Sequence, residues 1–131
     1  MIRYFRFLAL FITFTVLLCS CSNESYIQDI VEEKQSELPI RLDDQTTLIE
    51  IKAGENAFIY VNTLIGQSDE DFRKSKATIK ETIIKNLKQN MSADIKAIFN
   101  RGIHYEYQWL NESRELLFEF RVTAEDLNIK D

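Results

Sequence analysis

The sequence has few of the residues that catalytic and metal sites use most. It contains one histidine and two cysteines in 131 residues, and both cysteines lie within the first 21 positions. A tetrahedral zinc site needs three or four nitrogen and sulfur ligands, so His104 cannot form one alone. The sequence also lacks a glycine-rich phosphate loop and a serine in a nucleophile-elbow pattern. We therefore expect no catalytic centre, no metal site and no cofactor.

Glycine and proline are also scarce, with three glycines and one proline in the whole chain. Such a chain has little room for long irregular loops or a flexible linker between domains. Without residues 1–20, the remaining 111 residues carry 14 basic and 21 acidic side chains, a net charge of −7. An acidic surface repels nucleic acids. The composition predicts a single acidic domain with no nucleic-acid partner.

The N-terminus has the layout of a secretory signal. Arg3 and Arg6 precede an uncharged apolar run, residues 7–18, and small and polar residues follow. A helix needs roughly 20 apolar residues to cross a bilayer, so this run is short for a permanent span. A one-pass membrane anchor is the alternative interpretation.

The cleavage region of this signal resembles the lipobox of bacterial lipoproteins. An aliphatic Leu18 precedes Cys19, Ser20 and Cys21. The resemblance implies cleavage between Ser20 and Cys21, so that Cys19 leaves with the signal and the sulfur of Cys21 carries diacylglycerol. Anchoring through several acyl chains at ~0.8 kcal/mol per buried CH₂ is in effect permanent. Cleavage elsewhere, with a leftover thiol, is the alternative.

This resemblance sets the domain organisation and the location that we expect. Residues 1–20 are the signal peptide, 21–24 the lipidated cysteine with a short tether, and 25–131 a single domain. Ser22 follows the cysteine, and by resemblance to enterobacterial lipoproteins a serine there favours export to the outer membrane. The expected location is therefore the periplasmic face of the outer membrane, with the membrane contacted through the lipid on Cys21.

Hydrophobic periodicity predicts the secondary structure of the domain. Helical spacing covers 25–38, up to Pro39, and two apolar runs at 46–53 and 57–64 predict a hairpin. A helix begins near Ser68 and carries an apolar stripe to about residue 90. A second helix begins at Ser92 and ends at Gly102.

The last part of the domain gives the strongest signal, a strict alternation of apolar and polar residues in two runs, 103–110 and 116–122. We expect one buried face, formed by Ile103, Tyr105, Tyr107, Trp109, Leu116, Phe118, Phe120 and Val122. Residues 123–131 read as a polar tail. The predicted fold is α+β with two layers, in the order α-β-β-α-α-β-β. Its sheet is four-stranded and antiparallel, built from two hairpins, with helices packed on one face.

The domain also resembles a group of small exported bacterial proteins. These share an LP-x-x-x-D-x-x-T segment, a strand, and then a glycine followed by a Y-x-Y strand. The matching residues in this chain are Leu38, Pro39, Asp43, Thr46, Gly102, Tyr105 and Tyr107. The resemblance supports the predicted fold and implies no activity.

Five polar residues share the other face of the predicted terminal hairpin: His104, Glu106, Gln108, Glu119 and Arg121. They form either an ordinary solvated face with cross-strand pairs or a recognition surface for a protein. A catalytic interpretation makes Glu106 or Glu119 an acid–base with help from His104. That chemistry needs a carboxyl with a raised pKa, which an open face with Arg121 nearby does not favour.

The sequence therefore predicts a non-enzymatic outer-membrane lipoprotein that holds an envelope protein near the inner leaflet. Assembly or pilot factors, exclusion lipoproteins and immunity lipoproteins belong to this class. The alternative is a periplasmic module that binds a small molecule or lipid in a pocket between helix 72–87 and the aromatic face of the sheet.

The two cysteines make the anchor testable. Cys21→Ala should abolish incorporation of a labelled fatty acid, because Cys21 supplies the only sulfur to which diacylglycerol attaches in this interpretation. Cys19→Ala, the matched control, should incorporate the label like the wild type. Equal labelling of all three proteins would contradict the lipoprotein prediction.

Overall fold

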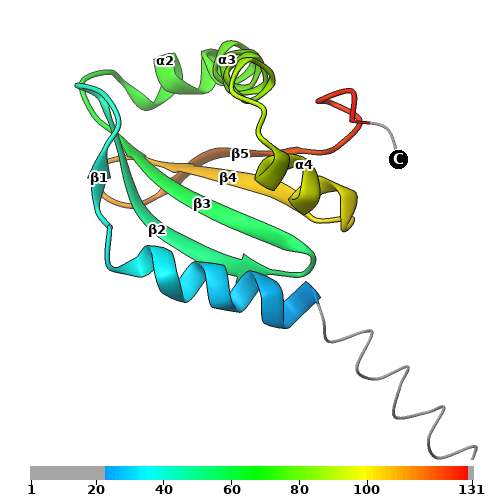
Figure 1. The fold of residues 1–131 in the computed structure, drawn as a ribbon. Coiled ribbons are helices and arrows are strands. Elements are labelled where there is room, and N and C mark those ends of the chain that lie inside the picture. Colours follow the sequence, from blue (N-terminus) through cyan, green and yellow to red (C-terminus); the bar gives the residue numbers. More distant parts are fainter. Residues whose placement is uncertain (1–22, 130–131) are drawn as a thin grey trace, which may run out of the picture.

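The computed structural model describes residues 23–129, which form one curved sheet with helices against one of its faces (Figure 1). The strands, in their order across the sheet, are β1 (Ile40–Arg41), β2 (Thr46–Gly54), β3 (Ala57–Leu64), β4 (His104–Leu110) and β5 (Leu116–Val122). The helices are an N-terminal helix at 23–35, α2 (Asp69–Lys74), α3 (Lys76–Gln89) and α4 (Ala93–Asn100). The predicted α+β class is confirmed.

Both predicted hairpins are present. β2 pairs antiparallel with β3 through a turn in which Asn56 has a φ of 49°. β4 pairs antiparallel with β5, and the side chain of Asn111 closes the connecting turn by accepting a hydrogen bond from the backbone N–H of Glu115 at 2.9 Å. Asparagine suits both turns, because its side chain bonds nearby backbone and it tolerates positive φ better than most residues.

The prediction of a four-stranded antiparallel sheet is wrong in two respects. The sheet has five strands, because the two residues of β1 pair with β2 directly after Pro39. The sheet is also mixed, because β3 and β4 run parallel. The chain between them crosses one face of the sheet through three helices and returns in its original direction, as parallel pairing requires.

The helix starts predicted at Ser68 and Ser92 agree with the structure, but the long helix is divided. The helix predicted at 25–38 spans 23–35, so residues 23 and 24 of the predicted tether are helical. The hydroxyl of Ser68 accepts from the N–H of Asp71, and that of Ser92 accepts from the N–H of Ile95, each at 3.2 Å. The predicted helix between Ser68 and residue 90 is α2 followed by α3, with the break at Ser75. The Ser75 hydroxyl donates to the carbonyl of Asp71 at 3.1 Å, a local bond of the kind that bends helices.

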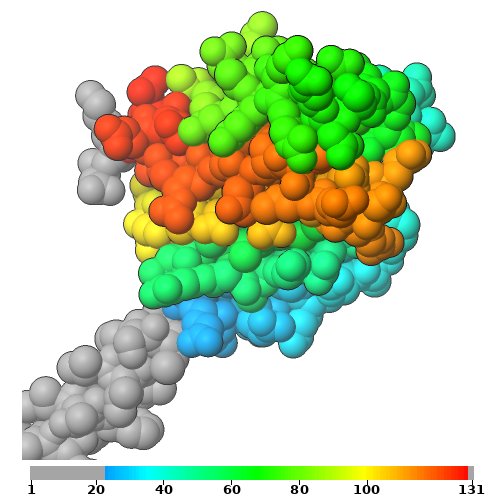
Figure 2. All heavy atoms as spheres, turned by 180° about the vertical axis from the view of Figure 1, so that it is seen from behind, coloured from blue at the N-terminus to red at the C-terminus, as the bar shows by residue number. Residues whose placement is uncertain are grey.

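The core lies between the helices and the aromatic face of the sheet. We define this face by Phe58, Tyr60, Tyr105, Tyr107, Trp109, Phe118 and Phe120, whose rings contact one another across β3, β4 and β5. Ile27, Phe72 and Phe99 pack on this side from three different helices. From behind, strands β2 to β5 form adjacent bands between the N-terminal helix and the α2–α3 segment, and no helix covers them (Figure 2).

Two bulges change which side chains are buried. In β2 the register shifts between Leu48 and Glu50, so that Leu48 faces the core together with Ile51, although strict alternation separates them. In β5 the register shifts after Leu116, which is 50% exposed, whereas Leu117 is 7% exposed. The predicted burial of Leu116 is therefore wrong, because the extra residue of a bulge reverses the alternation locally.

The C-terminal segment is also more ordered than the predicted polar tail. Asp126 accepts a hydrogen bond from the backbone N–H of Thr123 at 3.0 Å, which closes a tight turn. Leu127 is buried and Ile129 packs against the core. Residues 123–129 therefore belong to the domain.

Several predictions concern the first 22 residues and lie outside the described part of the chain. They are the signal peptide at 1–20, cleavage between Ser20 and Cys21, the lipid on Cys21 and the effect of Ser22. Within residues 23–129, no helix combines the length and the apolar character that a membrane crossing needs.

The bulge in β5 gives a direct test of the fold with one residue type at two neighbouring positions. Leu117→Ala should lower the free energy of unfolding by about 2–5 kcal/mol, because a buried leucine leaves a cavity. Leu116→Ala, the control, should change it by less than about 0.5 kcal/mol, because this leucine is exposed. Urea denaturation measures both. A larger loss of stability in Leu116→Ala than in Leu117→Ala would contradict the bulge and support the strict alternation predicted from the sequence.

Candidate functional site

An open groove of about 610 Å³ runs over the aromatic face, between α3 and the connection from β1 to β2. Its walls come from segments far apart in the sequence, residues 42–46 on one side and 72–86 on the other. It lies over the ends of β3 and β4 that are marked by Leu64 and Trp109. The rest of the aromatic face is covered, because α4 places Phe99 against Tyr105 with ring centroids 4.8 Å apart.

The wall formed by α3 is uncharged, although the helix is rich in lysine. The groove is lined by Ser75, Thr78, Thr82 and Asn86, which follow one another at intervals of three and four residues. This spacing places them along one edge of the helix. Ile79 and Ile83 lie beside this edge and also line the groove, yet no residue of α3 is fully buried. The helix covers the sheet only in part and leaves apolar surface accessible.

The floor of the groove combines apolar and polar side chains. Leu64, Tyr107 and Trp109 provide the apolar part, and Thr46 and Asn62 the polar part. Asn62 and Trp109 are direct neighbours in the register of β3 and β4. The opposite wall carries Leu42, Asp43 and Gln45.

Burial shifts the titration of three tyrosines on the aromatic face. Loss of solvent around the hydroxyl raises the pKa of Tyr60, Tyr105 and Tyr107 above the ordinary value for a phenol. The rings are in contact, with centroids of Tyr60 and Tyr107 5.2 Å apart and of Tyr60 and Tyr105 5.3 Å apart. The three phenols are therefore packing groups and hydrogen-bonding groups at neutral pH.

The five residues predicted to share a polar sheet face do lie together. Glu106 is opposite Arg121 and Gln108 is opposite Glu119 in the register of β4 and β5. Glu106 Oε1 is 2.9 Å from His104 Nε2 and 3.5 Å from Arg121 Nη2. The polar face, as we call this set, is the uncovered face of the sheet seen in Figure 2. Glu106 and Arg121 pair across strands, which fits either a solvated face or a recognition surface.

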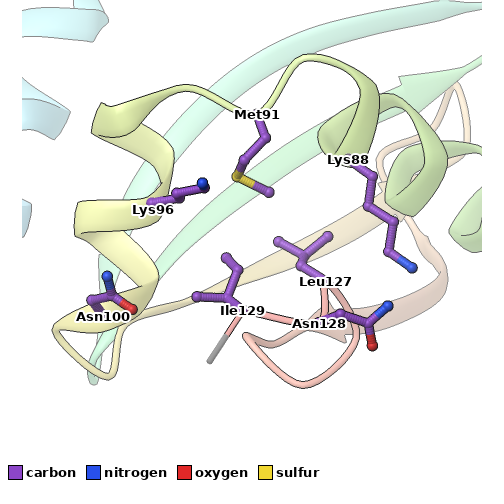
Figure 3. A pocket seen from close by; sticks show the side chains of 7 residues that line it. All are labelled: Lys88, Met91, Lys96, Asn100, Leu127, Asn128 and Ile129. Atoms are coloured by element: carbon purple, nitrogen blue, oxygen red, sulfur yellow. The ribbon is translucent and has the colours of Figure 1, made fainter. Parts of the chain in front are cut away.

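A second hollow of about 360 Å³ lies near the C-terminus (Figure 3). Figure 3 shows Lys88 and Lys96 on opposite sides of it, with Met91, Leu127 and Ile129 between them. Both lysines are exposed. Among the described residues, no group of three or more histidine, cysteine, aspartate or glutamate side chains is placed to hold a metal ion.

Sequence reasoning identified the position of the groove but not its polar lining. A pocket between helix 72–87 and the aromatic face was an alternative hypothesis, and the groove occupies that position. The neutral edge Ser75–Thr78–Thr82–Asn86 and the lone Asn62 in an apolar strand were missed. The sequence contains a signal for each. The edge consists of uncharged residues at helical spacing in a lysine-rich helix, and Asn62 interrupts an otherwise apolar run.

Comparison with known proteins shows the fold. No protein-family model matches the sequence, and no curated protein sequence is significantly similar to it. A Pseudomonas aeruginosa protein described as secreted is similar in structure, with a TM-score of 0.70 at 10% identity, covering 80% of this chain and 92% of that one.

Two pilotins of type 2 secretion systems share the fold as well. EpsS of Vibrio vulnificus gives a TM-score of 0.65 at 16% identity, covering 80% of this chain and 91% of that one. AspS of Vibrio cholerae gives 0.55 at 15% identity, with 79% and 91% covered. At such low identities these likenesses establish a common fold.

The tyrosine cluster predicts how the domain responds to alkali. Because the folded-state pKa of each phenol is raised, the folded state holds these protons more tightly than the unfolded state. The contribution to stability is complete below the unfolded pKa of about 10 and is lost as the pH rises above it. Absorbance at 295 nm should show Tyr60, Tyr105 and Tyr107 ionising only with unfolding. Free titration of all tyrosines near pH 10 in the folded protein would contradict the buried cluster.

Proposed function

We propose that this protein is a lipid-anchored, non-enzymatic envelope protein that holds a partner protein by binding one of its helices in the groove. The groove carries the proposal, because half-buried apolar side chains, Ile79, Ile83 and Tyr107, remain accessible in it beside polar ones. A concave site lined by apolar side chains and a few polar groups is the usual form of a binding site. An amphipathic helix that lays its apolar face in such a groove is a common mode of recognition.

The arrangement of helices favours a helix as the occupant. The N-terminal helix, α3 and α4 form a layer over the aromatic face, and α4 covers only the half that carries Tyr105 (Figure 1). The groove occupies the other half, between α3 and residues 42–46. A partner helix seated there completes the layer and covers the half-buried Tyr107, Ile79 and Ile83.

The groove and the start of the N-terminal helix, which follows the proposed anchor in sequence, lie at opposite ends of the domain. The Asn23 side chain donates to the carbonyl of Arg101 at 2.9 Å and reaches Asn56 at 3.5 Å, which fixes the start of the N-terminal helix beside the β2–β3 turn. β3 runs from that end to Leu64 in the groove. Eight residues at ~3.3 Å each separate the two ends by roughly 25 Å. The anchored domain therefore presents its groove toward the periplasm.

The structural likeness to two pilotins supports a pilot-type role within this class. The proposal for this chain is an outer-membrane lipoprotein that keeps an envelope protein close to the inner leaflet during assembly. The polar face, His104, Glu106, Gln108, Glu119 and Arg121, is a second surface for the same or another protein.

A small-molecule or lipid-binding module is the second candidate function. The groove volume of about 610 Å³ lies within the ~300–1,000 Å³ usual for ligand pockets, and aromatic side chains form part of its floor. A detergent-like or fatty-acid ligand that binds with micromolar affinity and excludes proteins from the groove would favour this candidate.

Site-specific photocrosslinking in intact envelopes tests the groove. Benzoylphenylalanine at Thr82 should give a discrete crosslinked product, because this side chain lines the groove. The same group at Ala77, which is exposed on the same helix outside the groove, is the control and should give none.

A third position, Glu119, reports on the polar face. Crosslinks at Glu119 but not at Thr82 would move the docking surface to the uncovered side of the sheet. Absence of a specific crosslinked product at both Thr82 and Glu119 would contradict a protein-holding role.

A further inference from the structure

The polar groups that the domain buries are concentrated on the floor of the groove. Thr46 and Asn62, 8% and 2% exposed, are the two buried polar residues among 23–129, and both line the groove. Trp109, which also lines it, has the one buried side-chain nitrogen or oxygen in that range without a hydrogen-bond partner. Asn62 and Trp109 lie side by side in β3 and β4.

Asn62 is unfavourable for the fold itself. It interrupts the apolar run of β3, and asparagine is depleted in strands. Its amide group makes one long hydrogen bond, from Nδ2 to the carbonyl of Tyr60 at 3.5 Å. An amide offers two donor hydrogens and two acceptor positions, so most of its capacity remains unused. An apolar residue at this position would satisfy the strand and the core better.

We propose that Asn62 selects the partner: the groove binds a helix that carries one polar residue at the centre of its apolar face. A serine, threonine, asparagine or glutamine at that point hydrogen-bonds the Asn62 amide. This inference rests on the proposed function and specifies the partner's chemistry. A single buried asparagine sets the register of paired helices in the same way, since a shift by one turn leaves the amide unpaired.

The rims of the groove carry opposite charges, which orients the occupant. Asp43 is the one charged residue among those that line the groove, and a hydrogen bond from the N–H of Gln45 at 2.8 Å helps to lower the pKa of its carboxyl. On the other side, exposed Lys85 does not line the groove itself, but it lies three residues after Thr82 and seven after Thr78, which places it at the border of the groove-lining edge of α3. It makes no ion pair with any residue of the described range. The partner helix therefore has an acidic flank beside α3 and a basic flank beside Asp43.

A displayed library of 18-residue amphipathic helices, selected on the full-length protein in detergent micelles, tests the inference without knowledge of the partner. The apolar stripe is constant, and the central stripe position and the two flanks are randomised. Wild type should enrich serine, threonine, asparagine or glutamine at the centre. Asn62→Leu should enrich leucine, isoleucine or methionine there, and Lys85→Glu should replace the acidic flank by a basic one.

Affinities of one selected peptide and its leucine-centred version give the quantitative test. Wild type should prefer the polar centre by about tenfold, and Asn62→Leu should reverse the preference. Thr63→Val, at the next position of β3 and on its other face, is the control and should keep the wild-type ratio. Urea denaturation should show Asn62→Leu at least as stable as the wild type, and Asn62→Thr, a second variant, should retain a polar preference.

The outcomes separate this inference from the proposed function. Helices with apolar centres that bind wild type and Asn62→Leu equally, yet lose binding in Thr82→Arg, would overturn the role of Asn62 and leave the groove as the docking site. Selected peptides that bind Thr82→Arg as well as wild type would overturn both.

Discussion

The aromatic face of the sheet has to be kept from water, and this requirement governs the rest of the domain. Its rings lie on three adjacent strands and contact one another from Phe58 to Phe120. A parallel pair in the centre of the sheet forces the connecting chain across one face. The helices of that connection cover the aromatic side and leave the polar face open. The groove is the part of the aromatic face that these short helices do not reach.

The sequence was most informative where burial repeats with a fixed period. The alternation in β4 predicted that His104, Glu106 and Gln108 share a face, and the capping residues predicted where α2 and α4 begin. The relative direction of β3 and β4 was not predictable, because it depends on how the intervening helices pack and no local pattern encodes it. The bulges at Ile49 and Leu117 could not be predicted from the sequence for a related reason. A bulge adds one residue to one strand, and only the partner strand reveals the shift.

The candidate site, too, was predictable only in part. A pocket between helix 72–87 and the aromatic face was an alternative hypothesis, and the groove lies at that position. Its polar lining did not follow, because Asn62 reads as an isolated exception until Trp109 is placed beside it. Residues that are unfavourable for the fold carry information about binding, since a protein retains them where another molecule supplies the missing hydrogen bonds.

The parallel pairing of β3 and β4 also bears on the order in which the domain forms. Each hairpin joins strands that are close in the chain, whereas the central pair joins Ala57 to His104, 47 positions apart. Closing such a loop is entropically unfavourable and slow compared with hairpin formation. A chain that is synthesised N-terminus first holds the residues of its first hairpin well before those of β4 are available. The aromatic face then stays incomplete until nearly the whole chain is available.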